Sequence, residues 1–154
     1  MLVWQMESYP IGDRRLPHSC FPPKNLTVDQ LQQKLGVVYY KVDLDDTAAT
    51  KKRLSRLNSK KSDILTIDEN VVGLKQMLED LYKPQECTKE EMICMVLEGS
   101  MYCDVEIEEE EWVRIQLERG DLIIVPKGKA YRYTTTPKNF VRLQRFAQRS
   151  ETQG

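Results

Sequence analysis

The stretch GDLIIVPKGKAY, residues 120–131, decides the fold. Its Gly-Asp pair predicts a tight turn, and the four branched apolar residues that follow predict a buried strand. Pro126 ends that strand because proline cannot donate to a β-ladder. Five residues separate Gly120 from Pro126-Lys127-Gly128, and two more precede Tyr131. This spacing is the most specific feature of the chain.

The segments on either side repeat the pattern of short strands and turns. In residues 112–117, Val113, Ile115 and Leu117 alternate with polar residues, as expected of a half-buried strand. Further strands are predicted over residues 92–97, 101–107, 122–125, 131–134 and 141–146, with a turn at Glu98-Gly99-Ser100. Short strands at this spacing indicate a β-sandwich or barrel.

The N-terminal part is predicted to be mixed. Its prolines indicate an irregular segment over residues 1–25. A capping box from Thr27 to Gln30 predicts a helix that Gly36 ends. Beyond it we expect a strand over 37–42, a basic helix over 47–61, a strand over 63–67 and a helix from an Asn70 cap to Pro84.

Composition narrows the class of protein. The chain has 154 residues, enough for one ordinary domain. Its net charge of -1 argues against a dedicated nucleic-acid binder, and no apolar run reaches the length of a membrane span. The start lacks the features of a secretory signal, and the four cysteines are scattered. We therefore expect reduced thiols and a cytoplasmic protein whose size also admits it to the nucleus.

The single histidine excludes a large group of sites. Any intrachain site that needs two or three imidazoles is impossible, and His18 alone limits histidine acid–base chemistry to one position. We expect His18 to serve as a structural hydrogen-bonding group rather than as a metal ligand.

The spacing from Gly120 to Tyr131 resembles the second motif of the cupin superfamily, whose last position is normally a metal-binding histidine. The segment that ends at Gly99 resembles the first cupin motif. Matching stretches also include residues 12–18, 35–43, 62–67 and 97–105. Their order and spacing resemble one family, the acireductone dioxygenases of methionine salvage.

The resemblance implies a fold and an activity. Family members are monomeric jelly-roll cupins, mainly β with flanking helices. They bind Fe(II) or Ni(II) through three histidines and one glutamate, and they oxidise acireductone with O₂. The iron form yields formate and the keto-acid precursor of methionine, whereas the nickel form yields carbon monoxide as well. On this basis we expect one cupin domain over residues 1–147. Its helix-containing N-terminal part would span about 1–83, its motifs about 84–135, and a tail 148–154.

Every one of the family's ligands is changed at the matching positions. Counted back from Gly99, the first histidine falls on Glu86, the second on Thr88 and the glutamate on Met92. The third histidine falls on Tyr131, and the arginine that steadies the anionic substrate falls on Cys94. Because Fe(II) and Ni(II) favour imidazole and carboxylate ligands, we predict no metal ligands and no cofactor.

Three hypotheses follow. The first is an inactive family member that binds a small ligand or a protein in the former pocket. The second is an active dioxygenase whose Fe(II) or Ni(II) is held by Glu86, Tyr131 and Glu90 or Glu91. The third is an interaction scaffold whose pocket is packed shut. An open cavity between Glu86, Met92 and Tyr131 would favour ligand binding, and a filled one would favour the scaffold.

Overall fold

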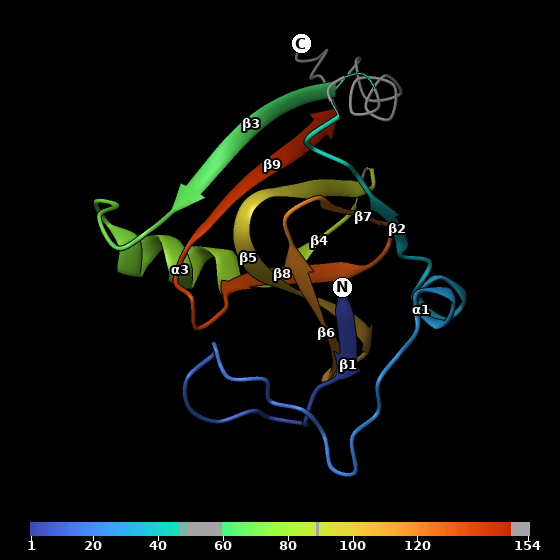
Figure 1. The fold of residues 1–154 in the computed structure, drawn as a ribbon. Helices are drawn as coiled ribbons and strands as arrows, with labels where there is room; N and C mark the ends of the chain where they lie inside the picture. The colour runs from blue at the N-terminus through green and yellow to red at the C-terminus, as the bar shows by residue number, and fades with distance from the viewer. Residues whose placement is uncertain (47, 49–59, 89, 149–154) are drawn as a thin grey trace.

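The computed structural model describes residues 1–46, 48, 60–88 and 90–148. The described residues form nine strands in one continuous hydrogen-bonded sheet. The longest strand, β5 (Met92–Glu108), curves through the centre of the molecule (Figure 1). Two groups of strands flank its two halves, and the arrangement is that of a jelly roll.

The first half of β5 pairs with β7 (Asp121–Val125) and β9 (Val141–Gln148). The outer neighbours on this side are β2 (Val38–Lys41) and β3 (Lys60–Ile67). The second half of β5 pairs with β6 (Glu111–Glu118) and β8 (Ala130–Thr135). The outer neighbours here are β1 (Leu2–Gln5) and β4 (Gln85–Glu86). The apolar core lies between the two groups.

Gly99 lies where β5 passes from one group of strands to the other. Its φ of 78° is left-handed, and a Cβ there would meet the Phe140 carbonyl oxygen at 2.2 Å. Only glycine fits such a position. The predicted turn at residues 98–100 is therefore wrong, because these residues form an irregularity within one bent strand.

Two helices, α1 (Val28–Leu35) and α3 (Leu74–Tyr82), flank the strands in the part of the chain that the structure describes. The first has the predicted capping box at Thr27 and ends at Gly36. The second packs beside β8. Neither helix, nor any other in the described ranges, is long and apolar enough to cross a membrane.

Two other predictions for the N-terminal part need correction, and a third concerns residues that lie outside the described ranges. Asn70 is not a helix cap, because a turn at Asp68 precedes it and α3 begins after Gly73. The irregular N-terminal segment contains the short strand β1. The predicted basic helix falls on residues 47 and 49–59, which lie outside the described residues, and its last two residues already belong to β3. The predicted tail also lies outside them from residue 149 onward.

Candidate functional site

A cavity of about 620 Å³ opens at one end of the strand array. Its wall combines residues from β3, α3, β4, β5, β8 and β9. A second cavity of about 270 Å³ adjoins it, and the two share Met92, Tyr131 and Phe146. The larger volume is in the range of small-molecule sites.

The four positions that match the family's ligands lie around the smaller cavity. Glu86 ends β4, Thr88 follows it, Met92 begins β5 and Tyr131 lies near the start of β8. Strand pairing brings them together, because Glu86 pairs with Ala130 next to Tyr131. The spacing-based assignment thus selects residues that are neighbours in space.

These four side chains do not fit Fe(II) or Ni(II). Burial raises the pKa of Tyr131 to about 12, so its phenol keeps its proton near neutral pH. The Met92 sulfur, a soft thioether, accepts a hydrogen bond from the Tyr133 hydroxyl at 3.0 Å. Glu90 and Glu91 also line the smaller cavity, yet no three His, Cys, Asp or Glu side chains converge as metal ligands in the described residues. Hard divalent cations prefer imidazole and carboxylate, which this arrangement does not assemble.

The thiols near the cavities are protonated. Cys87, Cys94 and Cys103 are free and buried, and burial raises the pKa of each. For Cys94 the pKa rises to about 12. Cys20 is free and half-buried. The three buried thiols match the expectation of small apolar side chains rather than thiolate ligands.

Several wall residues of the larger cavity were not anticipated from the sequence, and Tyr133 and Arg145 are the two that bear on its chemistry. Tyr133 projects from the same face of β8 as Tyr131. The two rings pack edge to face, with 5.4 Å between their centroids. The period of two along a strand would have found Tyr133 once Tyr131 was placed. Arg145 comes from β9, and only the strand register reveals its position.

Arg145 lies directly opposite Cys94 across the β5–β9 pair. Cys94 is the position that motif spacing matches to the family's substrate-steadying arginine, and the neighbouring strand places the Arg145 cation directly opposite it. This cation is already engaged: its Nε and Nη2 donate to the two carboxylate oxygens of Asp63 at 2.9 and 2.5 Å. The ion pair lowers the pKa of Asp63 and raises that of Arg145.

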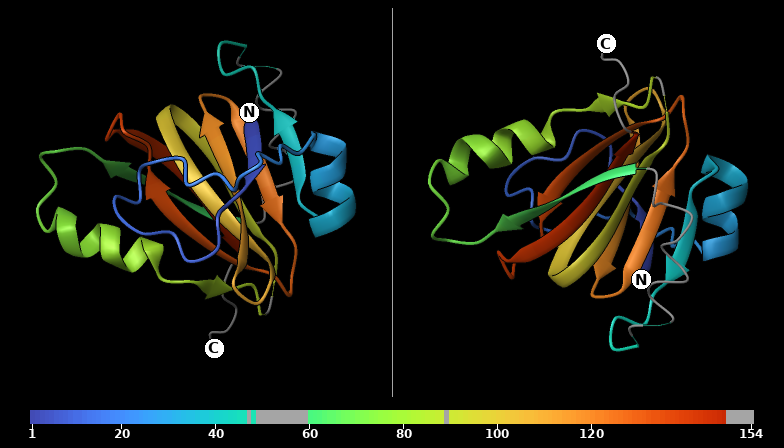
Figure 2. Two further views of the ribbon diagram at one scale, coloured as in Figure 1. Left: turned by 90° about the horizontal axis from the view of Figure 1, so that it is seen from below. Right: turned by 90° about the horizontal axis from the view of Figure 1, so that it is seen from above.

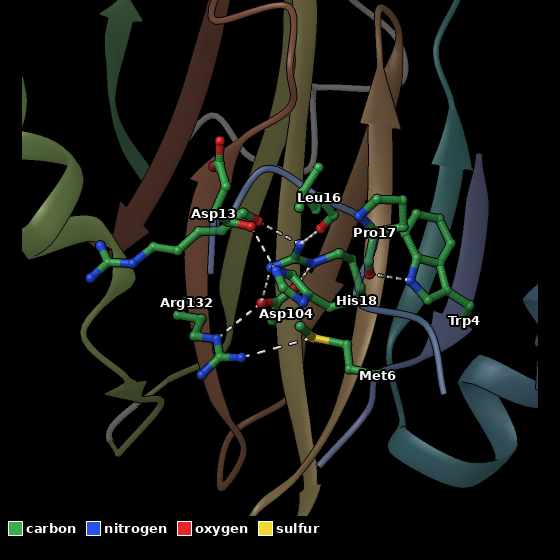
Figure 3. A network of polar contacts seen from close by, with 10 residues as sticks. Trp4, Met6, Asp13, Leu16, Pro17, His18, Asp104 and Arg132 are labelled. Atoms are coloured by element: carbon green, nitrogen blue, oxygen red, sulfur yellow. Dashed lines mark hydrogen bonds and ion pairs between the residues drawn. The ribbon is translucent and has the colours of Figure 1, made fainter. Parts of the chain in front are cut away.

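The only histidine is outside both cavities. His18 lies in the N-terminal segment, where Nε2 donates to the Asp13 carbonyl oxygen at 2.6 Å (Figure 3). Its side chain is buried and hydrogen-bonded within this segment. It cannot serve the cavities, because neither of them includes it in its wall.

The N-terminal segment crosses the outer face of β5, β6 and β8 (Figure 2). A buried ionic cluster fixes it there. Arg114 donates two hydrogen bonds to Asp104, at 2.8 and 2.9 Å, and two more to the carbonyl oxygens of Arg14 and Leu16. Arg132 donates to the same carboxylate at 2.9 Å.

Comparison with known proteins agrees with this fold. Residues 2–153 match the family model described as the ARD/ARD' family. The chain belongs to the ARD/ARD' family. The matched residues cover nearly all of the chain, so the family assignment applies to both the N-terminal segment and the strand array.

Its relatives in this family fall into two groups. The chain is 52% identical over 153 residues to "Probable inactive acireductone dioxygenase 1" of Caenorhabditis elegans, covering 97% of this chain and 96% of the relative. It is 33% identical over 148 residues to acireductone dioxygenase of Homo sapiens, covering 94% of this chain and 81% of the relative. The higher similarity is to a protein whose name describes it as inactive.

A solved structure supports the fold. Acireductone dioxygenase from Bacillus anthracis, with a cadmium ion in its active center, superimposes with a TM-score of 0.71 at 17% identity. The match covers 98% of this chain and 96% of that chain. The jelly-roll cupin fold predicted from the two motifs is therefore confirmed.

Proposed function

We propose that this chain is a catalytically inactive member of the ARD/ARD' family that has kept the cupin fold and uses its pocket for binding. The family relation and the similarity to relatives named as inactive support the proposal. It takes no catalytic step in methionine salvage and acts as a monomer without a metal cofactor.

The observation that carries the proposal is the donor set around the smaller cavity. Glu86, Thr88 and Met92 replace two histidines and a glutamate, and a protonated Tyr131 replaces the third histidine. The chain's single histidine lies elsewhere. An enzyme that depends on imidazole nitrogen to hold its metal has no such ligand here.

The larger cavity favours binding over a pure scaffold. Among the described residues, the space between Met92, Tyr131 and Arg145 is not filled by side chains and measures about 620 Å³. The adjoining space between Glu86, Met92 and Tyr131 measures about 270 Å³ and is likewise open, whereas a pure scaffold is expected to have this pocket packed shut. The location we propose is the cytoplasm, with access to the nucleus, and four free cysteines support a reducing compartment.

One experiment tests this proposal by measuring both the bound metal and the turnover of acireductone. Tag-free protein is offered Fe(II) or Ni(II) without oxygen, freed of excess metal, and analysed for bound metal and for acireductone consumption. We expect less than about one tenth of an equivalent of metal and no turnover above buffer. Stoichiometric metal together with turnover would overturn the proposal.

A variant with restored ligands is the matched control. The combination Glu86→His, Thr88→His, Met92→Glu and Tyr131→His rebuilds the family's ligand set on the same scaffold. Because these positions surround one cavity, we expect this variant to bind close to one equivalent of Fe(II) or Ni(II). Failure of the folded variant to bind metal would show that the scaffold itself has moved away from a metal-binding geometry.

A further inference from the structure

We propose that the larger cavity binds a small, uncharged carbonyl compound with an apolar body, whose oxygen accepts hydrogen bonds from Tyr131 and Arg145. The inference rests on the proposed function, since it assigns a ligand class to the pocket that the inactive protein retains. Three features of the cavity support this ligand class: its shape, its hydrogen-bonding groups and its charge.

The wall of the cavity suits an apolar body. Leu81, Met92, Ile93 and Phe146 supply hydrocarbon and thioether surface, and the rings of Tyr131 and Tyr133 supply aromatic surface. The volume of about 620 Å³ accommodates a ring system with one substituent. Burial of such a body is favourable by about 25 cal/mol for each Å² of apolar surface removed from water.

Three side chains of the wall, Tyr131, Tyr133 and Arg145, can donate hydrogen bonds to a ligand. The Tyr131 hydroxyl makes no hydrogen bond with any described residue, and Arg145 engages Asp63 through Nε and Nη2 but not through Nη1. The Tyr133 hydroxyl donates to the Met92 thioether, a weak acceptor that a ligand oxygen would outcompete. Donors without strong acceptors select a ligand that brings its own acceptor oxygen.

The charge of the wall selects an uncharged acceptor over a carboxylate. Asp63 already neutralises Arg145 through two hydrogen bonds. Asp80 lies at the exposed rim beside Lys83, at 3.5 Å. A ligand carboxylate would therefore enter a half-buried site in which Arg145, the one cation that the described residues place in the wall, is already neutralised by Asp63. A desolvated charge without a partner is expensive. A ketone, ester or amide oxygen meets the same donors without that cost.

Three fluorescent probes with one aromatic body test the inference. They are dimethylaminonaphthalene bearing a propionyl group, the same ring bearing a carboxylate, and the unsubstituted ring. Each is titrated into the full chain in excess EDTA, with emission recorded as the readout. Since EDTA removes metal, a failure here is separate from a failure of the metal and turnover experiment.

We expect the ketone to bind about tenfold more tightly than the unsubstituted ring, since each 1.4 kcal/mol is tenfold in affinity. The carboxylate should bind more weakly than the ketone. Tyr131→Phe and Arg145→Gln should each bring the ketone to within about threefold of the unsubstituted ring.

Two surface variants are the matched controls. Tyr9→Phe removes the same hydroxyl from an exposed tyrosine, and Arg142→Gln removes an ion-paired arginine on the same strand that does not line the cavity. Both should bind the ketone like the parent chain. If Arg145→Gln fails to fold, the affinity of Tyr131→Phe for the ketone is the deciding measurement. Equal binding of ketone and bare ring, tighter binding of the carboxylate, no binding at all, or a ketone affinity unaffected by Tyr131→Phe would each overturn the inference.

Discussion

The two faces of β5 and β8 differ sharply in how their polar groups are satisfied. On the outer face, Asp104 pairs with Arg114 and Arg132, and all three side chains are at most 10% exposed. On the inner face, Tyr131 lies one residue from Arg132 and opposite Val105, and its hydroxyl has no partner among the described residues. Alternation along a strand puts these neighbours into opposite environments.

The contrast separates structure from binding. The outer cluster satisfies nearly every donor and holds the N-terminal segment against the sheet (Figure 3). Such a network is expensive to disturb, because each partner left alone is a buried charge. The inner face has hydrogen-bond donors without strong acceptors beside an unfilled cavity. Such an arrangement contributes little to folding stability and is suited to ligand binding.

The largest expected effect is the loss of charge at the centre of the outer cluster. Asp104→Asn leaves Arg114 and Arg132 buried without their shared carboxylate. We expect the free energy of unfolding to fall by about 3–5 kcal/mol, measured by urea denaturation. Asp63→Asn is the control, because its ion pair with Arg145 is partly exposed and should cost no more than about 1 kcal/mol. Equal losses in the two variants would show that the outer cluster is not a special element of stability.

A smaller effect is expected from the rings around Arg132. Its guanidinium lies 4.1 Å from the Trp112 ring centroid and 4.4 Å from that of Tyr82. Trp112→Leu removes one of these cation–π contacts, and we expect a loss of about 2 kcal/mol in thermal or urea unfolding. Trp112→Phe keeps a ring and should lose less than the leucine variant. A larger loss for phenylalanine would contradict a cation–π contribution.

The inner face should be visible in the dependence of stability on pH. Burial raises the pKa of Tyr131 from 10.0 to about 12, so the folded state holds this proton more tightly than the unfolded state. Its contribution is complete below the unfolded pKa and is lost as pH rises through the folded pKa. Between about pH 10 and 12, the parent chain should lose up to about 1 kcal/mol per pH unit more than Tyr131→Phe, since solvent screening reduces the full linkage value. If the stabilities of the parent chain and Tyr131→Phe, taken from urea midpoints, change in parallel with pH, the result would contradict a buried phenol at Tyr131.

The smallest expected effect on stability accompanies a change in binding. Asp63→Asn removes the carboxylate that neutralises Arg145 at the cavity. Stability should fall by at most about 1 kcal/mol, while the carboxylate-bearing naphthalene should gain about tenfold in affinity relative to the ketone. The measurement is the same fluorescence titration in EDTA. An unchanged preference would mean that Asp63 does not control the charge of the cavity.

Much of the strand array could be predicted because each strand has a local signal. Alternation in residues 112–117 and the turn at Gly120 correspond to β6 and β7. The division of β5 into two strands was wrong because glycine signals a turn and a bulge alike. The choice between them depends on Phe140, whose carbonyl oxygen lies against Gly99 from a distant segment. The same alternation in residues 112–117 puts Arg114 on the polar face of β6, yet Arg114 is buried, because the N-terminal segment that covers it is about a hundred residues away in the chain.

The candidate site was only partly predictable. Motif spacing located Glu86, Thr88, Met92 and Tyr131, which do surround one cavity. The spacing carried no information about Arg145, whose place opposite Cys94 depends on the register of β9. The state of the cavity, open or packed, was also outside the reach of the sequence, because it depends on how side chains from six elements meet.

The sequence by itself determined the family, the cupin fold and the absence of histidine from the positions that match the family's motifs, because these depend on residue types at fixed spacings along the chain. Tertiary structure alone decided which groups face the pocket, which of their protons are retained and which charges are already paired. Those properties depend on burial and on contacts between residues far apart in the chain. The absence of histidine from the motif positions is thus visible in the sequence, whereas the groups that line the pocket are visible only in the fold.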